Sequence, residues 1–257
     1  AGDPGEVLSP AVTRLATFRM FPAPGEQFHS NRRRPMLTFL KDAAPGKLLE
    51  LIDVWKARIQ VYDAAGLERP FWMRHSQGDH WDLLLLFPIE SYGAFFSAER
   101  KAKLVNATEN ASMPENKFRQ KIKELVAWHE DVFVQGAPLA DVKKAFGGMA
   151  YFHVEMFIAL PGKHAELVRE REMENAYLEH IGRPQNLIFE HDMGAAWDVF
   201  TIGCYRDLKH FAESADIPAD KEDEAARKAG FDGANKIGAY LRTLISRHND
   251  TLAGANR

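Results

Sequence analysis

Residues 45–52, PGKLLELI, recur as residues 161–168, PGKHAELV, and this repeat decides the fold. The offset is 116 residues. Without a gap, the same offset also aligns Gly66 with Gly182, His75 with His191, Gly78 with Gly194, Trp81-Asp82 with Trp197-Asp198, and Phe95 with Phe211. Eleven identities in one register predict two copies of one supersecondary unit.

Each copy shows the residue pattern of a strand, a helix, two strands and a second helix. In the first copy these elements are expected at 36–40, 45–65, 71–75, 81–89 and 91–104. In the second copy they are expected at 149–160, 161–181, 187–191, 197–204 and 207–215. The order β-α-β-β-α is most of a ferredoxin-like unit. We therefore predict an α+β fold in which two tandem ferredoxin-like units bury their open sheet faces against each other, as one eight-stranded α/β barrel within the chain.

The segments outside the repeat complete the expected organisation. Helical spacing of apolar residues predicts a further helix in each copy, over 115–133 and 234–252, and residues 12–21 form a further candidate strand. The expected domains are a first half at 1–135, which includes an N-terminal extension, a linker at 136–148 and a second half at 149–257.

Composition limits the classes of function. The chain has 257 residues, of which 46% are hydrophobic and 27% charged, as is typical of a soluble globular protein. A net charge of −3 gives no general attraction to nucleic acid or to anionic membranes. No apolar stretch approaches the roughly 20 residues that span a bilayer. The single cysteine, Cys204, excludes an intrachain disulfide.

The first residues bear on localisation. The chain begins Ala1-Gly2-Asp3, and small residues at a new N-terminus fit a removed export signal, although the remnant of a tag would look the same. This pattern favours export, to the periplasm or outside the cell, over a cytoplasmic location.

The order of these signals resembles a known family. A strand, Pro-Gly-Lys in the first turn of a helix, a glycine that ends the helix, and a hairpin with an aromatic residue near the start of its second strand resemble the NIPSNAP-like branch of the dimeric α/β-barrel superfamily, over residues 36–100 and 152–214. The resemblance implies a barrel with a cavity between two sheets. Relatives in that superfamily include cofactor-free monooxygenases, small isomerases, haem enzymes and proteins without an established activity. No motif here carries over a catalytic set or a haem ligand.

The two copies differ on their first strand. Leu37 and Phe39 of the first copy correspond to His153 and Glu155 of the second. The strand expected at 149–160 has an apolar opposite face, which is expected to lie under helices. Alternation would then direct His153 and Glu155 into the barrel. A buried charge needs a partner, water or a ligand, which makes this pair the first candidate site. The alternative is a strand at the rim with both side chains in water.

Other repeated residues are secondary candidates. His75 and His191 could transfer a proton or bind a metal, or could simply bond the hairpin turn. Trp81 and Trp197 are interpreted as architectural residues at the barrel end or beside a cavity. His129 and His248 are expected to close their helices, where the helix dipole favours a cationic histidine.

Two functions follow from these candidates. The first is a small-molecule enzyme of oxidoreductase or isomerase type that acts on a mostly apolar ligand, with His153, Glu155 and His191 as its catalytic groups. Two histidines and one carboxylate would suit a divalent transition metal. The second is a non-catalytic ligand-binding or assembly module with a packed barrel. A homo-oligomer fits either function.

Overall fold

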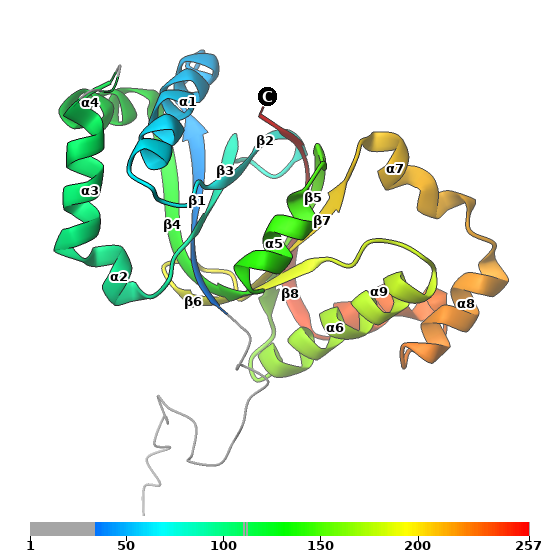
Figure 1. Cartoon of the computed structure of the whole chain (residues 1–257). Helices are drawn as coiled ribbons and strands as arrows, with labels where there is room; N and C mark the ends of the chain where they lie inside the picture. Colours follow the sequence, from blue (N-terminus) through cyan, green and yellow to red (C-terminus); the bar gives the residue numbers. More distant parts are fainter. Residues whose placement is uncertain (1–33, 110, 112, 257) are drawn as a thin grey trace, which may run out of the picture. The chain divides into compact units, whose positions relative to one another are not determined.

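The computed structural model describes residues 34–109, 111 and 113–256. Within these residues, eight antiparallel strands close into one barrel in the order β1-β3-β2-β8-β5-β7-β6-β4 (Figure 1). The strands are β1 (Arg34–Ala43), β2 (Phe71–Gly78), β3 (Leu83–Pro88), β4 (Val126–Gly136), β5 (Tyr151–Ala159), β6 (Leu187–Met193), β7 (Val199–Tyr205) and β8 (Ile245–Ala255). The barrel confirms the predicted α+β architecture. The candidate strand at 12–21 and the export expectation at Ala1 lie outside the described residues.

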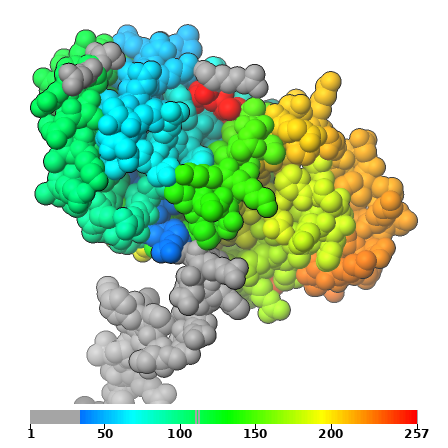
Figure 2. Space-filling model, in the orientation of Figure 1, coloured from blue at the N-terminus to red at the C-terminus, as the bar shows by residue number. Residues whose placement is uncertain are grey.

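Helices surround the barrel on two sides. They are α1 (Leu48–Ala64), α2 (Tyr92–Phe96), α3 (Ala98–Glu109), α4 (Glu115–Leu125), α5 (Leu139–Phe146), α6 (His164–His180), α7 (Leu208–Ala212), α8 (Ala219–Lys228) and α9 (Ile237–Arg242), with short 3₁₀ turns at Glu213–Asp216 and Ala234–Lys236. In Figure 1, α1 to α4 cover one side and α6 to α9 the opposite side, and Figure 2 shows the surface of α5 between them. No helix of the described residues is both long and apolar enough to cross a membrane.

The repeated Pro-Gly-Lys forms the turn from a strand into a helix. In both copies the lysine N–H donates to the carbonyl three residues earlier, at 2.8 Å from Lys47 and 2.9 Å from Lys163. Gly46 and Gly162 both have a φ of +76°, which glycine adopts readily at the third position of such a turn. The proline therefore lies in the turn before the helix, and not in the first helical turn as the sequence analysis assumed.

The strand registers of the two halves correspond, where β1 to β4 are the first half and β5 to β8 the second. Phe39 lies opposite Leu85 in the β1–β3 pair, and Glu155 lies opposite Thr201 in the β5–β7 pair. Both partners differ by the repeat offset of 116. The β2–β3 and β6–β7 pairs correspond in the same way.

The last strand of each half contradicts the sequence prediction. Helices were expected over 115–133 and 234–252, but α4 ends at Leu125 and α9 at Arg242, and both are followed by strands. β4 pairs with β1 and β6, whereas β8 pairs with β5 and β2. These two neighbours supply the backbone hydrogen bonds that the helix would have provided, so tertiary pairing overrides the helical spacing.

Three smaller differences concern the helices. The helix expected at 91–104 is divided at Ser97, whose hydroxyl accepts from the Arg100 N–H at 3.1 Å and so caps α3. The segment expected to be a linker contains α5. The second half contains α8, a helix that was not predicted. The domain boundaries at 135 and 149 stay a prediction.

The repeated glycines Gly78 and Gly194 lie where the two halves join. Their φ values are +122° and +111°. A Cβ atom on Gly78 would lie 2.1 Å from the carbonyl oxygen of Asp250, and one on Gly194 would lie 2.4 Å from that of Asp131. Only glycine allows the strands to approach this closely at both seams of the barrel.

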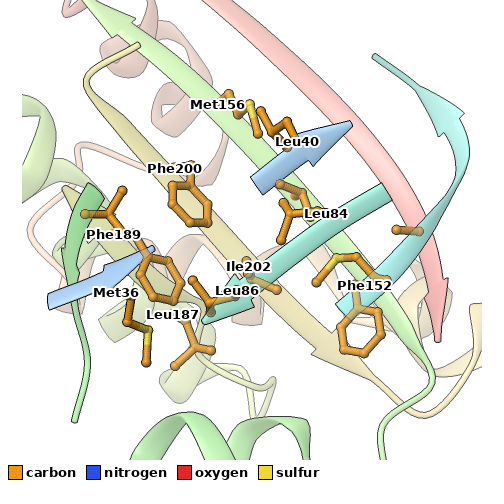
Figure 3. Close-up of a cluster of buried hydrophobic side chains, with 14 of the residues drawn as sticks. Met36, Leu40, Leu84, Leu86, Phe152, Met156, Leu187, Phe189, Phe200 and Ile202 are labelled. Carbon is orange, nitrogen blue, oxygen red and sulfur yellow. The ribbon is translucent and has the colours of Figure 1, made fainter. Parts of the chain in front are cut away.

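Side chains fill the barrel interior (Figure 3). Large apolar residues from both halves point toward one another there, among them Met36, Leu84, Phe152, Phe189 and Phe200. Val142 of α5 belongs to the same cluster and is fully buried. Side chains therefore fill most of the space between the two sheets in the described residues, and a hollow of about 130 Å³ lies at one end, lined by Leu40, Met156 and Trp197.

Candidate functional site

His153 and Glu155 lie on the outer face of β5, beneath α6, and not inside the barrel. The interior instead receives Phe152, Val154 and Met156, the apolar face that was expected to lie under helices. Alternation along the strand was predicted correctly, but the two faces were assigned the wrong way round. The reason is that both faces of β5 are covered, so an apolar face does not identify the side toward the helices.

Four ionisable side chains meet at this place, and we call His153, Glu155, His248 and Asp250 the outer cluster. His153 Nε2 lies 3.0 Å from Asp250 Oδ1. His248 Nε2 lies 3.3 Å from Glu155 Oε1 and 3.4 Å from Asp250 Oδ1. The first pair of residues belongs to β5 and the second to β8, and the β5–β8 register places Glu155 directly opposite Asp250.

Helix α6 brings further charges to the cluster. Arg171 is buried, and its Nη1 lies 3.7 Å from Glu155 Oε2. Its Nε donates to Glu170 Oε2 at 2.6 Å, and Nη1 also forms an ion pair with Glu174. The Thr201 hydroxyl of β7 donates to Glu155 Oε2 at 3.0 Å. Glu155 is thus held from a strand and a helix at once.

These contacts set the charges of the cluster. Burial by itself raises the pKa of Glu155, but the interaction with His248 and the charges of Arg171 and His153 outweigh it and hold the pKa at about 2. Burial by itself lowers the pKa of His153, but the hydrogen bond with Asp250 and the charge of Glu155 outweigh it, so the pKa is raised. Near neutral pH the cluster therefore contains an ionised Glu155 beside His153, whose protonated form these contacts favour.

Glu174 is shifted in the opposite direction. Its burial and the neighbouring carboxylates of Glu155 and Glu170 raise its pKa to about 7, despite the attraction of Arg171. Burial also raises the pKa of Glu170. One carboxyl beside the outer cluster can therefore take up or release a proton in the neutral range.

The outer cluster can supply metal ligands. One ligand atom each from His153, Glu155 and Asp250 lie within 4.8 Å of one another. His248 Nε2 is not part of this group of three; it is buried beside the Glu155 and Asp250 carboxylates and makes no hydrogen bond of good geometry within the described residues. The third ligand predicted from the sequence was His191. In the structure Asp250, and not His191, lies beside His153 and Glu155.

The same place in the first half is aromatic. Glu155 corresponds to Phe39, Arg171 to Trp55 and Gly203 to Phe87 at the repeat offset. The Phe39 ring centre lies 4.8 Å from that of Phe87 and 6.4 Å from that of Trp55. The first half therefore has aromatic rings where the second has Glu155 and Arg171, although Asp131, with its ion pairs to Lys41 and His129, lies opposite Phe39.

His75 and His191 lie beside the repeated tryptophans. His75 contacts Trp81 edge to face at 5.9 Å between ring centres, and His191 contacts Trp197 at 6.1 Å. The Ala195 N–H donates to His191 Nε2 at 3.3 Å, across the hairpin turn. This bond is the structural alternative considered for His191.

The repeated Trp-Asp pairs have architectural contacts. Trp81 and Trp197 are buried in the interior cluster, and Trp197 Nε1 donates to Glu130 Oε2 at 3.1 Å. Asp82 accepts from the Ala43 N–H, and Asp198 accepts from the Ala159 N–H, both at 2.8 Å. Each aspartate thus accepts a hydrogen bond from the last residue of the first strand of its half, which is β1 for Asp82 and β5 for Asp198.

The remaining candidates were assigned to the wrong kind of element. His129 and His248 lie in strands β4 and β8 and do not close helices. His129 is exposed and lies 3.2 Å from Asp131, whereas His248 faces Glu155. Asp250 and Arg171 were missed. The signal for Asp250 was the repeated ending His129-Glu130-Asp131 and His248-Asn249-Asp250, in which strand periodicity would place the first and third residues on one face.

Neither a protein-family model nor a curated protein sequence matches the chain. Solved structures share its fold. An anthrone oxidase-like protein has a TM-score of 0.52 at 14% identity, over 88% of this chain and 92% of that protein. A protein proposed to be a monooxygenase, from Lactobacillus acidophilus NCFM, has a TM-score of 0.50 at 8% identity, over 86% and 93%. At these identities the likeness shows the fold, an α+β protein with an eight-stranded antiparallel barrel.

Proposed function

We propose that the chain is a small-molecule enzyme of the oxidoreductase type, and that the outer cluster is its reacting centre. The convergence of His153, Glu155, His248 and Asp250 beneath α6 carries the proposal. A buried carboxylate costs several kcal/mol unless partners compensate for lost hydration. The first half fills the equivalent space with aromatic rings, so the fold does not require charges there. Groups with perturbed pKa values in such a place are candidates for function.

The donor set fits a divalent transition metal ion. Two imidazole nitrogens and two carboxylates are ligands that manganese, iron, cobalt and zinc accept. The buried His248 Nε2, which lacks a hydrogen bond of good geometry, supports the fit. An ion bound there would supply redox or Lewis-acid chemistry. Haem is not part of the proposal, because the sequence offers no motif for its ligation.

The protein groups around the centre control protons and access. Glu155 is buried, while the side chains of His153 and Asp250 keep 22% and 55% of their surface exposed. A substrate would therefore approach from the side of Asp250. In the metal-free protein the raised pKa of His153 favours its protonated form, and a metal ion held by His153 would take the place of that proton.

The surroundings favour a small and mostly apolar substrate. The Phe211 ring lies 5.5 Å from His153, and Tyr151 lies 6.0 Å from Phe211 on the same side. Two proteins that share the fold are described as an anthrone oxidase-like protein and a proposed monooxygenase. Oxidation of a small aromatic compound agrees with both observations, and it is the reason for preferring an oxidoreductase to an isomerase.

We also infer that the barrel consists of two tandem copies of a ferredoxin-like unit from the NIPSNAP-like branch. The common register at an offset of 116 and the seam glycines Gly78 and Gly194 support this inference. A tandem origin would explain why one place is aromatic and its counterpart ionic, since a second copy is free to acquire a site. Homo-oligomer formation stays a prediction.

Metal analysis and turnover test the proposed function. Untagged protein would be analysed for bound metal and then incubated aerobically with a panel of phenols and anthrone, with oxygen consumption as the readout. We expect turnover that is lost in Glu155→Gln and Asp250→Asn. The control Phe39→Leu changes the equivalent place of the first half and should keep turnover. Metal-free protein without turnover, before and after loading with manganese, iron or cobalt, would contradict the proposal.

One observation favours the second candidate function, a non-catalytic binding or assembly module. Side chains fill most of the barrel interior in the described residues (Figure 3), and the hollow of about 130 Å³ that Leu40, Met156 and Trp197 line at one end is small for a substrate. Under this function the outer cluster would be a structural ion network. Glu155→Gln would then change the free energy of unfolding but would leave metal binding unaltered.

A further inference from the structure

A cavity lies on the outer side of the first half, away from the outer cluster. Its volume is about 290 Å³, and the end of α1, the end of β3, and helices α2 and α3 enclose it. Figure 1 shows these elements together on one side of the barrel. Apolar side chains form one wall, namely Tyr62, Leu67, Phe87, Ile89 and Phe95.

Arg100 presents a guanidinium group to this cavity. Its Cζ lies 4.2 Å from the ring centre of Phe95 and 6.0 Å from that of Tyr62. Its Nη1 donates to the carbonyl oxygen of Phe95 at 3.4 Å. Among the described residues no carboxylate lies within ion-pair distance of Arg100, and the guanidinium contacts two aromatic rings and one carbonyl.

The second half shows what completes such an arrangement. Arg183 Nη2 donates to the carbonyl oxygen of Phe211 at 3.3 Å, and Phe211 corresponds to Phe95 at the repeat offset. There, however, Arg183 Nη1 also donates to Glu213 Oε2 at 2.9 Å. The residue that corresponds to Glu213 is Ser97, which lines the open cavity.

We propose that this cavity binds a small organic monocarboxylate, whose carboxylate takes the position at Arg100 that Glu213 takes at Arg183. The planar guanidinium can bind a carboxylate with two parallel hydrogen bonds. The apolar body of the ligand would lie against Tyr62 and Phe87. A volume near the lower end of the range of ligand pockets limits that body to about one ring.

The other charges at the cavity restrict the ligand to a single negative charge. Glu99 is paired with Lys103 at 2.8 Å, and Glu68 with Lys143 at 2.7 Å. Glu90 also lines the cavity and adds a negative charge. Arg100 therefore attracts one carboxylate, while Glu90 opposes a second charge on the same ligand.

Isothermal titration of the full chain tests the proposal with benzoate, phenylacetate and hexanoate, each compared with its neutral amide, and with phthalate and inorganic phosphate. We expect at least one monocarboxylate to bind about tenfold or more tightly than its amide, since a hydrogen bond to a charged group contributes at least that factor. Phthalate and phosphate should bind more weakly. If no acid binds better than its amide, the proposal is wrong.

Variants then locate the binding. Arg100→Gln should remove the preference for the acid, and Arg100→Lys, which keeps the charge but loses the planar fork, should retain part of it. Arg227→Gln removes an equal charge from an exposed pair on α8 and should leave binding unchanged. Ser97→Glu, which introduces the missing carboxylate, should abolish binding. Glu155→Gln should have no effect, which separates this site from the proposed catalytic centre. Tight benzoate binding by folded Arg100→Gln would overturn the assignment.

Discussion

Glu155→Gln is the most informative single change, because it removes the central charge of the outer cluster and keeps the shape of the side chain. Glutamine can still accept the hydrogen bond from Thr201, which Glu155 receives at 3.0 Å. It cannot supply the charge that faces Arg171 Nη1 at 3.7 Å and His248 Nε2 at 3.3 Å. The variant therefore measures how much the charge of Glu155 contributes to the free energy of unfolding.

The magnitude follows from the pKa of Glu155. In the folded protein the pKa is about 2, against an ordinary value of 4.5. The difference is about 2.5 pH units, and about 1.36 kcal/mol for each pH unit gives about 3 kcal/mol. Part of this loss is recovered, because without Glu155 the pKa of Glu174 falls and its carboxylate can ionise beside Arg171. We expect Glu155→Gln to lower the free energy of unfolding by about 2–3 kcal/mol at pH 7.

The pH dependence distinguishes this effect from a packing defect. A carboxyl whose pKa is depressed on folding stabilises the protein above its unfolded pKa, and the stabilisation is lost as pH falls through the folded pKa. The cost of Glu155→Gln should thus fall from about 2–3 kcal/mol at pH 7 to about 1 kcal/mol at pH 3. Phe39→Leu, the control at the equivalent place, should cost about the same at both pH values because it changes only packing.

Urea unfolding followed by tryptophan fluorescence measures both variants, with metal-free protein and at an unchanged m-value. A cost below about 1 kcal/mol at pH 7, or a cost for Glu155→Gln that is equal at pH 3 and pH 7, would refute the assigned charge state of Glu155.

Two further predictions concern α6 and the barrel seam. Glu174→Gln should stabilise the metal-free protein above pH 7, by up to about 3 kcal/mol, and have no effect below about pH 4.5, because a raised pKa means that ionisation of Glu174 opposes folding. Urea unfolding at pH 8 and pH 4 checks this, and equal stabilities at pH 8 would contradict it. Gly78→Ala should lower stability by at least about 2 kcal/mol, since the new Cβ would lie 2.1 Å from a β8 carbonyl, whereas Gly148→Ala, also at a positive φ but with open space, should cost about 1 kcal/mol. Thermal melts that rank the two glycine variants the other way would contradict the seam geometry.

Much of the fold could be predicted from the sequence because the repeat fixes corresponding residues. Strand alternation and the Pro-Gly-Lys turns identified six of the eight strands in the described residues. β4 and β8 were missed because a strand that closes a barrel is stabilised by its two neighbours, and the sequence of 126–136 alone does not reveal them. Local helical spacing was the only signal at hand, and long-range pairing overrode it.

The candidate site was half predictable for a related reason. The substitution of Leu37 and Phe39 by His153 and Glu155 correctly marked the place where the halves differ. The direction of these side chains could not be derived, because β5 is covered on both faces, by α6 on the outer side and by the apolar cluster on the barrel side. His191 was included because it is repeated, and in the structure its Nε2 accepts a hydrogen bond from Ala195 across the hairpin turn. Asp250 became a candidate only when β8 was found beside β5.

A cobalt titration tests the central claim most directly, because it compares the group that the structure brings together with the group expected from the sequence. Metal-free wild type, Asp250→Asn and His191→Gln would be titrated with Co²⁺ and followed by visible absorption. The proposed centre predicts about one Co²⁺ per chain in the wild type and in His191→Gln. The affinity for Co²⁺ should be at least 10–100-fold lower in Asp250→Asn, because loss of a residue that only hydrogen-bonds a metal ligand already lowers metal affinity by that factor. Equal loss of affinity in His191→Gln, or a wild type that binds no Co²⁺, would contradict a metal centre formed by the outer cluster.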